Sequence, residues 1–449
     1  MSILNRKESL ILGLGDIVLF VFALWLMLVF RYGNDLNSDI FYTHLAPFSL
    51  LFVVWLFVFF IAGLYEKHTL LLRSRLPGVL LQAVSVNSFI AVIFFYFIPY
   101  FGIAPKINLF ICLLLSFAFI LSWRIYGYRL LTIRRKQNAI IIGTGEELTA
   151  LTEEVNQNQR YGMRFVVSVE ANLLGDKNFE ATIIKRIQEE EITLVALDIK
   201  NKKIEPLLPH LYSLIFKSVQ FVDIHKLYED IFDRIPFSLV KYDWFLEHIS
   251  IMPSVGYDAF KRLMDITISL FGGILSLIFY PIIIALIKLD DGGPIFIFQE
   301  RVGAREKIIK IVKFRTMTRD DAGLKSAQKE NKPTRVGPFL RKSRLDELPQ
   351  FWNVFRGDLS LVGPRPELPS LVTVYEREVL YYSVRHLIKP GLSGWAQLYH
   401  DNHPHHKADV EETRIKLSYD LYYIKNRSFF LDLKIALKTI KKVMSRSGV

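Results

Sequence analysis

The segment Tyr257–Gly293, YDAFKRLMDITISLFGGILSLIFYPIIIALIKLDDGG, decides how the C-terminal half of the chain meets a membrane. Its apolar run, Ile266–Ile287, is long enough to cross a bilayer as one straight helix. Pro281 lies within the run, and a proline removes one backbone hydrogen bond and favours a kink. We therefore expect the helix to break near this proline.

Basic residues at both ends of the run indicate its topology. Lys261 and Arg262 precede it and Lys288 follows it, so all three suit the headgroup layer of one leaflet. We predict a re-entrant helix that dips into the membrane over residues 260–288 and returns. A fifth full span is the alternative that the sequence leaves open. The residues assigned to the dip are Lys261, Arg262, Asp265 and Pro281.

The whole chain is rich in apolar residues. Of its 449 residues, 51% are hydrophobic and 14% aromatic, and the mean hydropathy is +0.27, which points to membrane spans. The first apolar run is too long for the hydrophobic region of a signal peptide. We predict a four-helix transmembrane bundle within residues 1–136, with spans at Leu10–Phe30, Leu45–Leu64, Val79–Ile98 and Ile107–Trp123.

Basic residues are unevenly distributed between the loops of this bundle. Cytoplasmic loops carry an excess of Lys and Arg, so both ends of the bundle are expected in the cytoplasm. Asp16 lies within the first span and is expected near the interface or hydrogen-bonded inside the bundle. The basic residues that give this orientation are Arg6, Lys7, Lys67, Arg73, Arg75, Arg124, Arg129, Arg134, Arg135 and Lys136.

Short buried strands alternate with polar helical stretches after Gln137. The runs NAIIIG, FVVSVE, TLVALDI and VQFVDI predict a parallel, Rossmann-like α/β module within residues 137–250. Gly143 and Gly145 follow the first strand, and Glu170 ends the second, as in a dinucleotide fold. The third glycine is missing, and Glu146 and Glu147 would repel a pyrophosphate. A degenerate module for packing or regulation is expected, with nucleotide binding as the alternative.

Charge and cysteine content narrow the function further. Almost all of the net charge of +12 lies from Gly256 onward, which suits anionic lipid, phosphorylated ligands or nucleic acid. The single cysteine, Cys112, lies in an apolar run, so neither a disulfide framework nor a Cys-based metal site is expected.

The stretch RLDELPQFWNVFRGDLSLVGPRPE, Arg344–Glu367, contains an acid pair and a rigid basic turn. On a helix, Asp346 and Glu347 would project about 100° apart, so one could attack phosphorus while the other holds a cation. Arg365 lies between Pro364 and Pro366, which stiffen its backbone. A solvated acid pair, with an Arg344–Glu347 salt bridge, is the structural alternative.

Five motifs in order resemble the bacterial sugar transferase family, the polyprenyl-phosphate hexose-1-phosphate transferases, also called monotopic phosphoglycosyl transferases. These motifs are the Lys-Arg before a proline-broken helix, KFRTM, the Asp-Glu pair, GPRP and PGLSGWAQ. The resemblance covers about Tyr257 to Val449 and assigns residues 251–449 to a catalytic domain. The four upstream spans and the α/β module look like the large form of this family.

The resemblance implies roles for the motif residues. Asp346 would be the nucleophile and Glu347 the main ligand of Mg²⁺, since aspartyl-phosphates are known intermediates. Arginine and lysine side chains bind phosphate oxygens. The candidate phosphate ligands are Lys313, Arg315, Arg341 and Arg365. The candidate nucleotide-site residues are Pro364, Pro366, Gly391, Gly394, Trp395 and Gln397.

Three further features keep two interpretations each. Trp395 could stack on a base or pack under its loop. His400, His403, His405 and His406 resemble a metal cluster, but a variable loop fits their spacing better. The C-terminal stretch FFLDLKIALKTIKKVM could lie on anionic lipid or pack on the catalytic core.

The sequence favours transfer of a sugar 1-phosphate from a nucleotide diphosphate sugar, UDP-linked, to polyprenyl phosphate, at the cytoplasmic face of a bacterial inner membrane. This step would begin exopolysaccharide, capsule or O-antigen synthesis. A homodimer is plausible, and no nucleic-acid partner is expected. A membrane-anchored, NAD-dependent nucleotide-sugar dehydratase or epimerase is the alternative, since Tyr257 and Lys261 have Tyr-x-x-x-Lys spacing. A non-catalytic scaffold is the third class, and it leaves the acid pair unexplained.

Overall fold

The computed structural model describes residues 6–65, 76–98, 106–127, 137–158, 161–170, 183, 185–187, 189–217, 219–249, 255–317, 332–400 and 409–444. The chain divides into two compact units, Met1–Asp230 and Ile231–Val449. The predicted division into residues 1–136, 137–250 and 251–449 stays a prediction. Several residues of the sequence argument lie outside the described part: Lys67, Arg73, Arg75, Arg129, Arg134, Arg135, Lys136, His403, His405 and His406.

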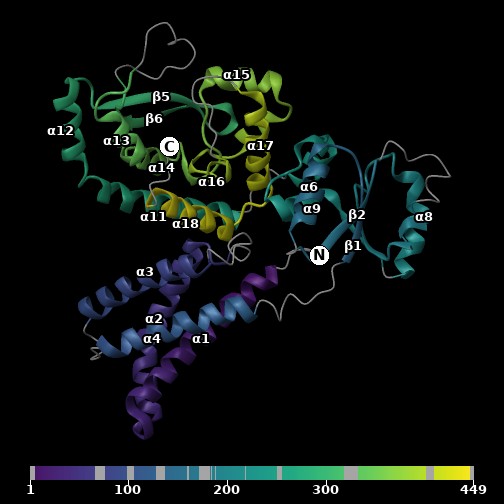
Figure 1. Ribbon diagram of the computed structural model, residues 1–449. Helices are drawn as coiled ribbons and strands as arrows, with labels where there is room; N and C mark the ends of the chain where they lie inside the picture. The colour runs from purple at the N-terminus through teal and green to yellow at the C-terminus, as the bar shows by residue number, and fades with distance from the viewer. Residues whose placement is uncertain are drawn as a thin grey trace. The chain divides into compact units, whose positions relative to one another are not determined.

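Four N-terminal helices form the apolar bundle that the sequence predicts (Figure 1). Each is long and apolar enough to cross a membrane. Aromatic side chains fill the bundle interior, where the rings of Phe20 and Phe52 stack with centroids 5.2 Å apart. Asp16 is buried, pairs with Arg124 and accepts a 2.7 Å hydrogen bond from Tyr65, which confirms its place inside the bundle. The helices are α1 (Arg6–Tyr32), α2 (Ser38–Ala62), α3 (Leu76–Phe97) and α4 (Lys106–Ser122).

A four-stranded parallel sheet follows, with strand order β2-β1-β3-β4. Apolar side chains from β1 and β3, such as Ile140 and Val195, are fully buried in its core. Helix α6 (Glu146–Gln157) begins after Gly145, whose φ of +129° favours glycine. The Rossmann-like assignment stays a prediction. The strands are β1 (Gln137–Ile142), β2 (Met163–Val169), β3 (Ile192–Leu197) and β4 (Gln220–Asp223).

The segment that opened the sequence analysis forms two helices, α11 (Val255–Ser276) and α12 (Tyr280–Asp291), bent by 57°. Pro281 lies in the first turn of α12, where its missing N–H leaves no hydrogen bond unmade. Pro281 cannot donate to the Leu277 carbonyl four residues before it. The Tyr280 amide donates to this carbonyl instead, at 3.2 Å. A broken span and a re-entrant helix are both compatible with this bend.

The two helices enclose part of the second unit. In Figure 1 they meet at a corner, with β6 (Ile308–Phe314) and α13 (Gly337–Lys342) on the inner side of the angle. Ile283 and Ile287 of α12 pack against Phe314 of β6 and Leu340 of α13. The ring of Phe351, on α14 (Gln350–Arg356), approaches Gly272 of α11 closely enough that a Cβ there would lie 3.1 Å from it. Both arms therefore contact the same unit.

The remaining elements of the second unit surround a small mixed core. Strands β5 (Phe296–Val302) and β6 (Ile308–Phe314) pair antiparallel, and β7 (Ser360–Val362) and β8 (Gly391–Ser393) pair in parallel. Helix α18 buries Asp432 and Ile435, so it packs on the catalytic core, one of the two arrangements predicted for it. Besides α11 and α12, the helices of this unit are α10 (Tyr242–His248), α13 (Gly337–Lys342), α14 (Gln350–Arg356), α15 (Pro369–Glu378), α16 (Trp395–Tyr399), α17 (Val410–Lys425) and α18 (Phe429–Met444).

Candidate active site

The acid pair lies on a single 3₁₀ turn, Leu345–Glu347, between α13 and α14. Arg344, with φ of +55°, reverses the chain just before this turn. The angle of about 100° expected between the two side chains on an α-helix is therefore corrected, since successive side chains of a 3₁₀ helix project about 120° apart. Asp346 is 8% exposed, so it is not solvated as the structural alternative expects, although the Arg344–Glu347 contact of that alternative is present at 3.4 Å.

Three cations surround the Glu347 carboxylate. Its Oε1 lies 3.5 Å from Lys313 Nζ and 3.6 Å from Arg365 Nη2, and its Oε2 lies 3.4 Å from Arg344 Nη1. Burial raises the pKa of Glu347, but the attraction of these cations outweighs burial and holds the pKa well below its usual range. Glu347 is therefore ionised at neutral pH.

Asp346 differs from its neighbour. Burial and the adjacent Glu347 charge raise the pKa of Asp346 to about 6, against the opposing effect of Lys313 and Arg341. The environment thus pushes the pKa values of two adjacent carboxyl groups apart, a pattern that in enzymes accompanies a division of chemical roles.

A small, partly open cavity lies beside Glu347. Its cationic wall carries Lys313 and Arg365, two of the candidate phosphate ligands, and also Arg301 from β5, which the sequence argument did not single out. Gln350 was also missed: it is 6% exposed, and its side-chain Nε2 has no hydrogen-bond partner among the described residues. The full lining is Arg301, Ile311, Lys313, Glu347, Gln350, Arg365, Pro366, Gly391 and Leu392.

Comparison with known proteins identifies the family of this region. Residues 256–446 match the family model described as bacterial sugar transferase. The chain is 40% identical over 191 residues to an uncharacterized sugar transferase of Bacillus subtilis, a match that covers 42% of this chain and 89% of that protein. The chain belongs to the bacterial sugar transferase family.

Two longer relatives of this family carry more specific names. The UDP-N-acetylgalactosamine-undecaprenyl-phosphate N-acetylgalactosaminephosphotransferase of Aeromonas hydrophila is 43% identical over 205 residues, 44% of this chain and 47% of that protein. The undecaprenyl-phosphate glucose phosphotransferase of Komagataeibacter xylinus is 29% identical over 341 residues, 71% of this chain and 61% of that protein. The chain therefore aligns with about half of the first relative's length.

Two of the predicted phosphate ligands of the transferase lie outside the cavity lining. Arg315 is 5% exposed, its Nε donates to the Pro294 carbonyl at 2.8 Å, and its guanidinium lies against Gly293. Arg341 donates to Thr316 Oγ1 at 2.9 Å, although its charge also acts on Asp346. These contacts indicate that Arg315 supports the fold beneath the site, whereas Arg341 contributes at its edge.

The PGLSGWAQ loop of the transferase divides in the same way. Gly391 lines the cavity, and a Cβ there would lie 2.1 Å from the Gly363 amide nitrogen, so close strand contact requires glycine. Trp395 is 1% exposed and donates to the Asp233 carbonyl at 2.8 Å. Its ring stacks on Tyr422, so it packs in the core, and the base-stacking interpretation is wrong for this position. Gly394 and Gln397 also lie outside the cavity lining.

The basic residues at the start of α11 are bound within the transferase unit. Arg262 donates to the carbonyls of Val354 and Phe355 at 2.8 and 2.7 Å, at the C-terminal end of α14. Lys261 donates to Asp432 at 2.8 Å. The expectation that both reach lipid headgroups is therefore corrected: they anchor α11 in the protein, since buried carboxylate and carbonyl groups need donors.

The acid pair is suited to Mg²⁺ only in part. Mg²⁺ binds through one or two carboxylates together with substrate phosphates. Glu347 offers an ionised carboxylate whose contacts with the surrounding cations, 3.4 to 3.6 Å, are longer than good hydrogen bonds. The groups of three carboxylate or histidine side chains found among the described residues lie elsewhere, at Asp198, Asp223 and His225 and at Glu306, Glu376 and His386. A metal at Glu347 would thus need oxygens from a substrate.

Proposed function

We propose that this protein transfers a sugar 1-phosphate from a UDP-linked sugar to undecaprenyl phosphate, giving undecaprenyl diphosphate sugar and UMP. The main support is the acid pair with opposite pKa shifts, held beside a cavity with three basic side chains. The names of the Aeromonas relative and of a glucose-1-phosphate transferase of Klebsiella pneumoniae, 39% identical over 190 residues, support the substrates. Such a reaction would begin a surface polysaccharide repeat unit.

The reaction that we infer has two steps. An Asp346 carboxylate oxygen attacks the sugar-bearing phosphorus, and the bond to the UMP oxygen breaks, which leaves an acyl phosphate on Asp346. A phosphate oxygen of the lipid then attacks the same phosphorus and releases the carboxylate. Lys313, Arg301 and Arg365 would neutralise the phosphate charge during both steps.

Glu347 is the residue that we assign to Mg²⁺. When bound, Mg²⁺ would neutralise the diphosphate and polarise its leaving oxygen. Glu347 also keeps Lys313 and Arg365 together on one side of the cavity, through the 3.5 and 3.6 Å contacts.

We also propose that α11 and α12 form a re-entrant helix pair and that the catalytic unit lies at the cytoplasmic face. Apolar side chains on both arms are exposed, for example Phe271 at 73% and Ile282 at 61%. Both arms also pack against the same unit. A straight span would place the far ends of the two arms on opposite sides of the bilayer. In a Cys112→Ser background, cysteines placed at Asp258 and Lys307 should be labelled only from the cytoplasm. Labelling from opposite sides would establish a fifth span.

The test of the chemistry uses membranes that contain the full chain and a panel of radiolabelled nucleotide sugars. One donor should pass its label to lipid, and EDTA should stop the transfer. Without lipid acceptor, purified protein should release one equivalent of UMP and keep a labelled adduct on the peptide that contains Asp346, removable by hydroxylamine. If UMP release strictly requires the lipid and no adduct is trapped, a direct transfer replaces the two-step reaction. If no donor labels lipid, the proposed function fails.

A further inference from the structure

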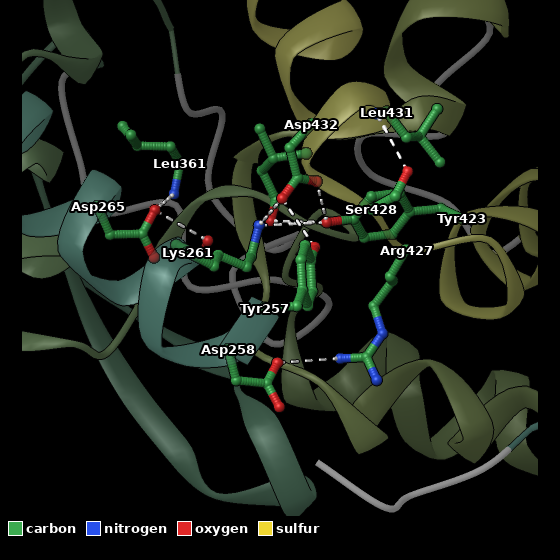
Figure 2. A network of polar contacts seen from close by, with 12 residues as sticks. Tyr257, Asp258, Lys261, Asp265, Leu361, Tyr423, Arg427, Ser428, Leu431 and Asp432 are labelled. Carbon is green, nitrogen blue, oxygen red and sulfur yellow. Dashed lines mark hydrogen bonds and ion pairs between the residues drawn. The ribbon is translucent and has the colours of Figure 1, made fainter. Parts of the chain in front are cut away.

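Helix α11 carries a stripe of polar side chains on the face that meets the catalytic core (Figure 2). Tyr257, Lys261 and Asp265 are spaced four residues apart, so they lie on one side of the helix. The first two have the spacing of a dehydratase-like pair, and Lys261 was also expected in the headgroup layer. In the structure both contact other protein groups.

The first two residues of the stripe, Tyr257 and Lys261, donate to one buried carboxylate. Asp432, which is 1% exposed, accepts hydrogen bonds from Tyr257 at 2.7 Å, Lys261 at 2.8 Å and Tyr423 at 2.7 Å. Figure 2 shows these donors gathered around Asp432. A buried charge is stable when its partners satisfy it, so this group fixes α11 against α17 and α18.

Asp265 extends the stripe to a different element. It is 3% exposed, and its Oδ1 accepts from the Leu361 amide at 2.9 Å and from the Ser360 hydroxyl at 3.1 Å. Both residues belong to β7, Ser360–Val362. Tyr423, bound to the same network, also approaches the Val362 carbonyl at 3.4 Å. Asp265 therefore holds Ser360 and Leu361 of β7, and Tyr423 of α17 approaches the third residue of the strand.

Strand β7 leads into the phosphate-binding turn. Gly363 and the Pro364-Arg365-Pro366 turn follow it directly, and Arg365 Nη2 lies 3.6 Å from Glu347. A β7 shift of about 1 Å would move the arginine fork relative to the acid pair, and misplacement on that scale can cost about a hundredfold in rate. The turn has a second support, since buried Arg385 donates to the Arg365 carbonyl at 2.9 Å.

We propose that Asp265 is a positioning residue through which the membrane-associated helix α11 sets the place of Arg365 in the active site. This proposal rests on the proposed transferase function and extends it. The seating of α11 in the membrane is thereby linked to phosphate binding, because the same helix exposes apolar residues such as Phe271 and holds β7 through Asp265. The contacts require no ligand, so the link also exists in the free protein.

The first test is a double-mutant cycle on the full-length protein in membranes. Asp265→Ala should lower the transfer rate at least about fiftyfold, whereas Asp265→Asn, which keeps an acceptor for the Leu361 amide, should recover most of that loss. In an Arg365→Ala background, Asp265→Ala should have almost no further effect, because its influence passes through Arg365. Asp258→Asn is the matched control: it is on the same helix, with its carboxylate 3.9 Å from Arg427, and should stay within about twofold of wild type.

If the double variant loses the transfer rate by the product of the two single losses, Asp265 and Arg365 act independently and the proposal is overturned. Hydrogen exchange gives a readout that does not depend on activity: Asp265→Ala should speed exchange in a peptide covering residues 360–366, and leave the α17 peptide, residues 410–425, unchanged. If Asp265→Ala does not fold, Ser360→Ala removes a single hydrogen bond and should show the same pattern more weakly. If Asp265→Ala speeds exchange in residues 360–366 but the wild-type protein transfers no sugar, the proposed function fails and the link between α11 and β7 stands. Unchanged exchange in residues 360–366 would sink the link alone.

Discussion

Two of the adjacent acid pairs near helix starts in this chain lie in opposite environments. Glu146 and Glu147 occupy the first turn of α6, where Glu146 is exposed and Glu147 is half-buried. Asp346 and Glu347 occupy a 3₁₀ turn before α14, beside Lys313 and Arg365. The same two-residue pattern thus serves a solvated helix start in one unit and a charged cavity in the other.

The chemical properties of an acid pair depend on its surroundings in the fold and not on the two residues alone. Negative side chains at a helix N-terminus are stabilised by the free amide groups there. Buried carboxylates need cations or protons, and at the second pair the surroundings supply cations to Glu347 and raise the pKa of Asp346. The predictions below test whether this contrast in environment is also a contrast in function.

The largest expected effect is on turnover. Asp346→Asn removes the nucleophilic oxygen charge and should lower sugar transfer at least about a thousandfold. Glu146→Gln, the matched change in the first pair, should leave transfer within about twofold of wild type. Both variants are compared by the initial rate of label entering lipid, at equal amounts of folded, membrane-inserted protein. A comparable loss in Glu146→Gln would remove the contrast and give the α/β module a catalytic part.

A smaller effect is expected from pH. The pKa of Asp346 is raised to about 6, and only its ionised form can attack phosphorus. The rate constant at low donor concentration should therefore fall about tenfold for each pH unit below that value and level off above it. A rate that stays constant from pH 7 down to pH 5 would mean that Asp346 does not act as a carboxylate in the rate-limiting step.

The smallest expected effect is on stability, with opposite signs at the two pairs. The folded pKa of Asp346 lies above the ordinary value of about 3.9, so its charge destabilises the fold above about pH 6 and not below about pH 4. Asp346→Asn should raise the thermal midpoint at pH 7.5 by a few degrees. Glu146→Gln should lower it slightly, because the charge at the α6 start is favourable by about 0.3 to 1 kcal/mol. Melting curves in one detergent, at pH 7.5 and pH 4.5, would show the gain from Asp346→Asn shrink at the lower pH.

Much of the architecture could be predicted from sequence because it depends on local patterns. Runs of about 20 apolar residues predict spanning helices whatever their neighbours are, and the four N-terminal helices agree with that expectation. Alternation of short apolar strands with helices likewise predicted the parallel sheet. Pro281 predicted a break in the following segment for a purely local reason, since a proline cannot donate a backbone hydrogen bond.

The side chains at the site depended on contacts between distant parts of the chain, which a local pattern does not contain. Lys313, Glu347 and Arg365 were singled out by their motifs, but only folding places Lys313 and Arg365 within 3.6 Å of the Glu347 carboxylate. The ring of Trp395 stacks on Tyr422 and not on a nucleotide base. Lys261 pairs with Asp432, which is 171 residues away in the sequence. The sequence by itself determined which helices and strands form and which residues can carry charge. Only the tertiary structure decided which charges are buried together, because burial and the distance between charges set a pKa or a role, and both arise when remote segments pack.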